Sequence, residues 1–314
     1  MSLRRLLATT ALALGLLGSS AVAAEEPGTT VDTLTATVQA TNIGVSGTAT
    51  FTGAPAVEVA TDATGDHVGN QTPAPTGTDL VSASIQALDA GTIRFEIEIG
   101  NLPPGGTREV INYNWPFTII KGGSAINYQI QAHSAATGRE VICSTGLFVC
   151  TGSPDNIGQP VFDLQTCTPN ATGGQDCASQ EVPGEMTDSS FIWSVPVTLL
   201  GAIGGGVTIE PNGNIAASRS ASGVTWWTDG SAGDSMVWDG DPFTVPVPAV
   251  SLGVDVAETP DDGVELTKTI AAKSNGSFTT TVPRPSTAGS YKLVAQACFG
   301  PGNCGLASTL FTVP

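Results

Sequence analysis

The chain has 314 residues, with 28 acidic and 11 basic side chains and a formal charge of −17. This acidic excess excludes nucleic acid as an expected partner and disfavours docking to an anionic membrane, because binding to phosphates depends on lysine and arginine. Glycine (38 residues) and proline (21 residues) are frequent, and 40% of the residues are hydrophobic. Since no stretch after the first 24 residues has a clear helical period, the composition predicts an all-β protein with apolar cores and many turns.

Residues 1–24 have the features of a secretory signal peptide. A pair of arginines precedes an apolar run over 6–17, and residues 21–24 (Ala-Val-Ala-Ala) supply a small-residue cleavage site. The apolar run is shorter than the ~20 residues that span a bilayer, and no later segment reaches that length. We therefore expect cleavage near Ala23 or Ala24, and a secreted, extracellular protein without a transmembrane segment.

The segment 61–104 opens with an acidic loop and continues into two patterned strands. Asp62 and Asp66 lie four residues apart with Gly65 between them, and Asp79 comes just before the first strand. Calcium takes six to eight oxygen ligands, several of them carboxylates, from a chain that can fold around the ion. The pattern predicts a calcium site formed by Asp62, Asp66 and Asp79. The alternative is an ordinary acidic turn with side-chain to backbone hydrogen bonds.

The two strands after Asp79 predict a hairpin. Apolar residues occupy every second position from 81 to 87 and again from 93 to 99, which is the period of a half-buried strand. The residues Asp89-Ala90-Gly91 between them provide the turn. Before this hairpin, we expect a polar leader with a first strand over 25–44, and short strands at 48–52 and 56–60.

Further alternating segments predict strands from 115 to 119, from 126 to 133 and from 191 to 197. In the second of these, apolar side chains face the core while four polar ones face water: Asn127, Gln129, Gln131 and His133. Residues 134–190 are the least patterned part of the chain and contain four of the six cysteines. We expect them to form irregular loops with short strands.

The cysteines form three close pairs in the sequence: Cys143 and Cys150, Cys167 and Cys177, Cys298 and Cys304. An even number of cysteines after a signal peptide favours disulfides. Six cysteines allow 15 connectivities, of which pairing between neighbours is the simplest, because glycine or proline in each short segment allows the chain to turn back. A zinc site would need closer spacing and histidines.

Two other groups of residues are candidates for binding. Trp226 and Trp238 could offer aromatic rings to a sugar, although core packing is the more ordinary role for tryptophan in a strand. A second acidic loop could hold a metal, but Asp-Gly pairs are often plain turns; its carboxylates are Asp229, Asp234, Asp239 and Asp241.

Prolines at 242, 246 and 248 indicate a linker over 244–248. This position divides the mature chain into a larger β-sandwich domain, 45–243, of jelly-roll or immunoglobulin-like type, and a smaller sandwich, 249–314. The smaller unit contains NGSF at 275–278 and GSY at 289–291, with a proline-containing turn between them. These residues resemble the bacterial immunoglobulin-like pattern, which implies the fold of this last fifth of the chain.

The larger unit resembles secreted β-sandwich modules of the DOMON and family-9 carbohydrate-binding types. The resemblance rests on Phe51, TDATGD at 61–66, Asp79-Leu80-Val81 and the strand IRFEIEI at 93–99. It implies a sandwich fold and calcium at the acidic corner, and some relatives bind sugars or haem. The chain departs from the pattern at His67, where a further acidic residue is common.

Motifs of known enzyme classes such as HExxH, GxSxG and the phosphate-binding loop are absent from the sequence. We therefore expect a non-catalytic structural or binding protein of the cell exterior, stabilised by calcium, with carbohydrate or cell-wall components as partners in adhesion or wall association. The alternative is an extracellular hydrolase, since the spacing of a catalytic carboxylate pair is set in three dimensions.

Overall fold

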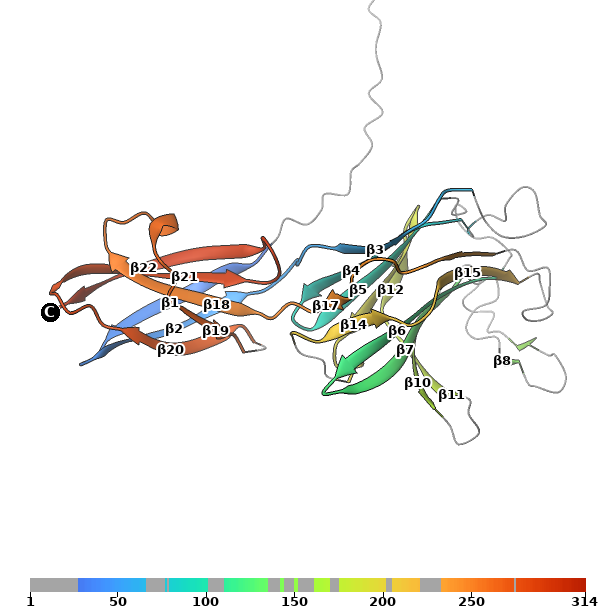
Figure 1. Cartoon of the computed structure of the whole chain (residues 1–314), viewed down its shortest axis with the longest axis horizontal. Helices are drawn as coiled ribbons and strands as arrows, with labels where there is room; N and C mark the ends of the chain where they lie inside the picture. The colour runs from blue at the N-terminus through green and yellow to red at the C-terminus, as the bar shows by residue number, and fades with distance from the viewer. Residues whose placement is uncertain are drawn as a thin grey trace, which may run out of the picture.

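The computed structural model describes residues 28–65, 77, 79–100, 110–134, 142–143, 150–151, 161–169, 175–201, 205–220, 233–273 and 275–314. These residues form antiparallel strands almost throughout, which confirms the predicted all-β sandwich fold. The one helical element in the described ranges is a 3-10 turn, η2 (Asp261–Gly263). The strands make two sandwiches placed end to end along the longest axis of the molecule (Figure 1).

The larger sandwich consists of two sheets. The first has the order β12-β13-β5-β4-β3. Its strands are β3 (Val57–Thr61), β4 (Leu80–Asp89), β5 (Thr92–Ile99), β12 (Gly184–Met186) and β13 (Ser190–Pro196). The second has the order β11-β10-β7-β6-β14-β17, with β15 pairing to β6 and β16 to β15. Its strands are β6 (Val110–Lys121), β7 (Ser124–Ser134), β10 (Val161–Pro169), β11 (Gln175–Glu181), β14 (Thr208–Pro211), β15 (Ile215–Ser220), β16 (Gly233–Met236) and β17 (Phe243–Thr244).

The core of the larger sandwich follows from the period-two pattern of its strands. The inward residues of the hairpin β4–β5, such as Ile85 and Phe95, are fully buried, while their neighbours in sequence are partly exposed. Phe95 packs edge-on against Trp115 of the opposite sheet, with ring centroids 5.3 Å apart. The predicted turn is also present, with the Gly91 amide donating to Asp89 Oδ1 at 2.6 Å.

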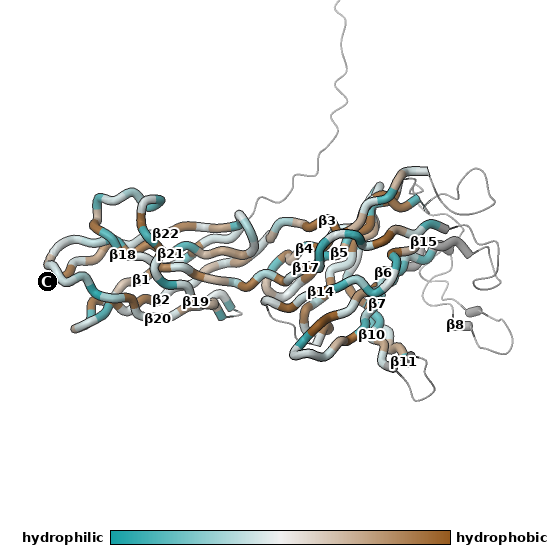
Figure 2. The backbone as a smooth tube through the Cα atoms, viewed as in Figure 1, coloured by the Kyte–Doolittle hydropathy of each residue, from teal (hydrophilic) through white to brown (hydrophobic). Residues whose placement is uncertain are grey.

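The smaller sandwich packs a three-stranded sheet, β1-β2-β20, against a four-stranded sheet, β19-β18-β21-β22. Its strands are β1 (Thr30–Val38), β2 (Asn42–Thr50), β18 (Ala249–Val256), β19 (Lys268–Ala271), β20 (Ser277–Pro283), β21 (Gly289–Cys298) and β22 (Cys304–Val313). Gly47 in β2 leaves room for the ring of Phe278, its cross-strand partner in β20 of the same sheet, because a Cβ there would lie 2.5 Å from that ring. Apolar segments run through the strands of both sandwiches (Figure 2).

The structure differs from the expected division of the chain at its N-terminal end. The predicted boundary at residue 45 falls inside β2, which pairs from Asn42 to Thr48 with β20 of the smaller sandwich. The chain therefore begins in the smaller sandwich, runs through the larger one from β3 to β17, and returns at β18. The larger sandwich is thus an insertion into the smaller one. The misassignment arises because β2 and β20 are separated by more than 220 residues, and local patterns do not reveal such pairing.

Two connections join the sandwiches, 51–56 and 245–248, and apolar residues fill the space between them. Phe51 of the first connection packs edge-on against Phe299, with ring centroids 6.3 Å apart. Buried Ala54 and Val245 belong to the same apolar cluster, which continues into both cores. The junction is therefore part of one continuous core rather than a solvated linker.

Disulfides close two hairpins, as predicted. Cys167 and Cys177 are directly opposite in β10 and β11, and Cys298 and Cys304 are opposite in β21 and β22. The strands β8 (Ile142–Cys143) and β9 (Cys150–Thr151) also pair, with their cysteines in register. Their side chains lie outside the described residues, so the third bridge stays a prediction. No helix in the described ranges is long and apolar enough to cross a membrane.

Candidate functional site

The described part of the acidic corner contains two of the three predicted calcium ligands, Asp62 and Asp79. The backbone amide of Asp62, just after β3, donates to Val81 of β4, and the Gly65 amide donates to Asp79 Oδ1 at 2.7 Å. Asp79 is only 7% exposed. Its other oxygen, Oδ2, packs against Gly100, where a Cβ would approach it to 2.6 Å. The loop therefore folds back on Asp79 as expected, whereas Asp66 and His67 lie outside the described residues.

The second acidic loop reaches the same corner. Asp234 in β16 is 6% exposed, and its Oδ2 accepts a hydrogen bond from the Leu80 amide at 2.9 Å. Its Oδ1 accepts from the Ser235 amide. Backbone amides thus stabilise a second buried carboxylate next to Asp79. A buried charge needs such hydrogen bonds, because burying it without them costs free energy. Asp239 and Asp241 are exposed, unlike buried Asp234, and Asp229 is outside the described residues, so a second site formed by these four carboxylates stays a prediction.

Tyr113 ties this corner to the opposite sheet. Its hydroxyl donates to the carbonyl of Gly77, two residues before Asp79, and its ring lies 4.1 Å from Phe191. Burial raises the pKa of the Tyr113 hydroxyl well above its ordinary value, which keeps the hydroxyl protonated and able to donate.

Calcium binding at this corner stays a prediction. One carboxylate oxygen of Asp62 and one of Asp79 accept backbone amides. In the described ranges, no three acidic, histidine or cysteine side chains gather in a way that could hold a metal. A full shell of six to eight oxygens would need Asp66 and backbone carbonyls of the acidic loop.

The expected aromatic platform does not form at Trp238. This side chain is 5% exposed and packs edge-on against Trp115, with ring centroids 6.0 Å apart. Its indole nitrogen donates to the Asp241 carbonyl. Trp238 is therefore a core residue, and its prediction as a sugar-stacking residue is wrong, because alternation in its segment turns the ring inward. Trp226 lies outside the described residues.

The outer face of the second sheet carries a group of amide side chains that we call the amide face: Asn114, Asn127, Gln129, Gln131 and Gln165. In β7, Tyr128, Ile130 and Ala132 are buried, while Asn127, Gln129 and Gln131 are half-buried on the opposite face. The register brings Gln131 opposite Asn114 of β6, and Gln129 opposite Gln165 of β10. Residues distant in sequence therefore form one surface.

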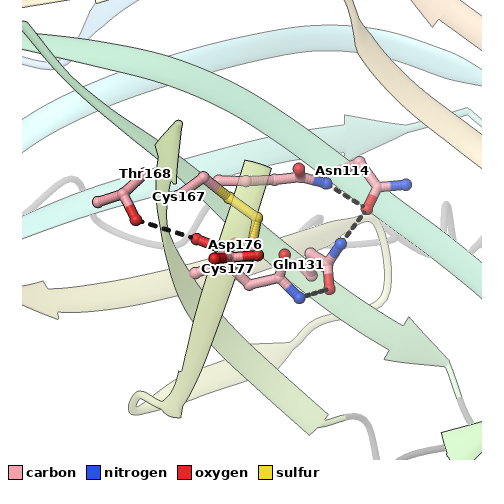
Figure 3. The surroundings of a disulfide bond; sticks show 8 residues. Asn114, Gln131, Cys167, Thr168, Asp176 and Cys177 are labelled. Carbon is pink, nitrogen blue, oxygen red and sulfur yellow. Dashed lines mark hydrogen bonds between the residues drawn. A yellow bond between two sulfur atoms is a disulfide. The ribbon is translucent and has the colours of Figure 1, made fainter. Parts of the chain in front are cut away.

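These amides hydrogen-bond to one another in a chain. Gln165 Nε2 donates to Gln131 Oε1 at 2.8 Å, and Gln131 Nε2 donates to Asn114 Oδ1 at 2.9 Å. Gln129 Nε2 also donates to Asn114 Oδ1, at 2.9 Å. Figure 3 shows Asn114 and Gln131 of this group near the Cys167–Cys177 disulfide. Because each bond fixes the orientation of an amide, the network holds donors and acceptors in set positions on the face.

The water-facing prediction for Asn127, Gln129 and Gln131 is confirmed, but sequence reasoning did not identify them as a site. The available signal was a run of three amides at every second position in one strand. Asn114 and Gln165 could not be added to it without the pairing of β6, β7 and β10.

Comparisons of the chain with known protein families, curated proteins and solved structures found no match.

Proposed function

We propose that the chain is a secreted, non-catalytic binding protein of the cell exterior that contacts carbohydrate through the amide face. The network from Gln165 through Gln131 to Asn114 carries this proposal. Secretion is supported by the signal-peptide features of residues 1–24 and by two disulfides, which persist in oxidising compartments. Association with a cell wall or with other cells would follow from such contact.

The chemistry of the amide face suits sugar hydroxyl groups. Each Asn or Gln side chain offers both a donor and an acceptor, and a hydroxyl group does the same. The network amides have no charge to desolvate, and their mutual bonds reduce the entropy lost when a ligand orders them. The strands around them form a rigid base, since Tyr128 and Ile130 are buried directly beneath.

A structural role for the buried carboxylates supports a binding protein over the alternative hydrolase. Asp79 and Asp234 are buried and accept backbone amides that hold the corner together. Such groups stabilise the fold through charge-assisted hydrogen bonds. A turnover screen on polysaccharides and esters tests the alternative: activity that is lost on neutralising a single carboxylate would overturn the non-catalytic proposal.

Affinity electrophoresis tests carbohydrate binding directly. The chain from residue 25 onward would migrate through native gels containing xylan, mannan, mixed-linkage β-glucan or pectin. We expect retardation in at least one gel and reduced retardation for Gln131→Ala. The matched control is Gln296→Ala, a half-buried amide on β21 of the smaller sandwich, which should behave as the wild type. Unretarded migration in every gel, together with an empty glycan array, would contradict the proposal.

Calcium at Asp62, Asp66 and Asp79 is a second part of the proposal. Asp62 and Asp79 share the corner where the acidic loop folds back, which supports it. We expect calorimetric binding of calcium at millimolar concentration or below, and a lower melting temperature after chelation, both lost in Asp66→Asn. Absence of binding heat at millimolar calcium, with no thermal shift on chelation, would leave the corner as an acidic turn.

A further inference from the structure

A depression of about 420 Å³ lies on the outer face of the first sheet of the larger sandwich. It is on the sheet opposite to the amide face, so it belongs to a separate surface. Its lining includes three glutamates and three serines from four neighbouring strands: Glu58, Ser82, Ser84, Glu96, Glu98 and Ser190.

The strand register explains why these side chains meet. Glu58 of β3, Ser84 of β4 and Glu96 of β5 are directly opposite one another in one row. Ser82, Glu98 and Ser190 form the next row, two residues along the strands. With a strand spacing of about 4.8 Å and a rise of about 3.4 Å per residue, the backbone positions of the three glutamates lie roughly 7 to 12 Å from one another and surround the two central serines.

The depression has an excess of negative charge. Arg94 Nη2 pairs with Glu96 Oε2 at 2.9 Å and neutralises one of the three glutamates. Glu98 Oε2 accepts a hydrogen bond from Ser82 Oγ at 3.0 Å, which orients it but leaves its charge. Glu58 is exposed on the neighbouring strand. Two negative charges therefore remain across a hollow lined with hydroxyl groups.

Ser190 gives a second, independent indication of a ligand. The residue is 5% exposed and lines the depression. Its backbone groups bond with Thr187, but in the described part of the chain its hydroxyl has no recorded partner. Among the described residues this hydroxyl is not one of the fully buried atoms that lack a partner, so on a residue that is otherwise buried it is the group open to the hollow. A ligand group that enters the hollow would satisfy it.

We infer that this depression, which we call the glutamate–serine groove, binds an alkylammonium group: a flexible organic cation such as a diamine or a lysine side chain. An ammonium group has three donors and no acceptor, which matches a site made of carboxylate and hydroxyl oxygens. The carboxylates lie on separate strands at spacings that suit an extended cation with more than one charge.

Isothermal titration calorimetry at low ionic strength tests this inference with 1,4-diaminobutane as the probe. We expect weak binding of the diamine, with Kd in the millimolar range, that weakens further as salt screens the charges. Glu98→Gln and Glu58→Gln should each weaken binding by about two- to fivefold, as expected for partly exposed ion pairs. A lysine-containing tripeptide, titrated in parallel, distinguishes a free amine from a peptide as the source of the group.

The controls separate the groove from general attraction to an acidic protein. Glu258→Gln removes an exposed glutamate of the smaller sandwich and should leave binding unchanged. The uncharged probe 1,4-butanediol should not bind. The inference is overturned if the diamine does not bind at all, or if Glu258→Gln weakens binding as much as Glu98→Gln does. Failure of carbohydrate binding at the amide face would not affect either outcome.

Discussion

Asn303 and Thr52 are 251 residues apart in sequence, yet Asn303 Nδ2 donates to the Thr52 carbonyl at 2.7 Å. Asn303 lies in the turn between β21 and β22, and Thr52 follows β2 in the connection to the larger sandwich. Asn303 Oδ1 also accepts a hydrogen bond from the backbone amide of Thr29, just before β1. One buried amide therefore holds three segments at the junction of the sandwiches.

Asn303→Asp should destabilise the protein by about 2–3 kcal/mol, because the carboxylate cannot donate to the Thr52 carbonyl and places a charge at a position that is 1% exposed. Urea unfolding at neutral pH measures this change. Asn214→Asp is the control, since Asn214 is exposed in the larger sandwich and should shift the free energy of unfolding by less than about 0.5 kcal/mol. Equal effects of the two substitutions would show that Asn303 does not secure the junction.

Acid should weaken the smaller sandwich through Asp261. Hydrogen bonds from Lys292 and then Ser308 hold the pKa of the Asp261 carboxyl below its ordinary value. The unfolded chain therefore takes up a proton at higher pH than the folded chain does. The resulting stability is present above the ordinary aspartate pKa and is lost as pH falls through the lower, folded value.

Asp261→Asn removes this contribution, and it also leaves the buried Lys292 ammonium without its carboxylate partner at 2.6 Å. We expect the variant to have a lower free energy of unfolding than the wild type at pH 7. The difference between their free energies of unfolding should become smaller towards pH 2. Guanidinium unfolding between pH 7 and pH 2 measures this difference. The control is Asp262→Asn, which changes the exposed neighbour of Asp261. A difference in the free energy of unfolding that does not change with pH would contradict a stabilising pair between Asp261 and Lys292.

The disulfide Cys298–Cys304 should contribute about 2 kcal/mol, since it closes a short loop and short loops restrict the unfolded chain less than long ones. The double variant Cys298→Ala and Cys304→Ala removes it without leaving a free thiol. Thermal unfolding of this variant should show a lower melting temperature. Reducing agent should lower the melting temperature of the wild type by more, because Cys167–Cys177 is also reduced. An unchanged melting temperature in the double variant would contradict this contribution.

The sequence predicted the local architecture well, and the reason is physical. The β4–β5 hairpin, its turn and the Cys298–Cys304 hairpin are defined by period-two alternation, turn residues and short cysteine spacing. Each of these depends on contacts between residues close in the chain. The placement of β1 and β2 in the smaller sandwich could not be predicted in this way, because β2 pairs with β20 across the whole inserted sandwich.

The candidate sites were less predictable, because they form between strands. Asp62, Asp66 and Asp79 were expected to converge. The Gly65 amide, from the loop that follows Asp62, does bond to Asp79, but Asp66 lies outside the described residues and the convergence of the three carboxylates stays a prediction. Trp238 was expected to offer a surface ring, but the register turned it into the core. The Asn114–Gln131 contact and the row of Glu58, Ser84 and Glu96 depend on cross-strand register, which the sequence does not specify residue by residue.

The amide face is proposed to bind carbohydrate. The most direct test of this binding compares Gln131→Ala with Gln296→Ala in native gels containing the polysaccharide that most retards the wild type. Removing Gln131 breaks two bonds of the network, to Gln165 and to Asn114, so we predict about a tenfold loss of affinity for Gln131→Ala and no loss for Gln296→Ala. Equal retardation of both variants and the wild type would contradict the claim.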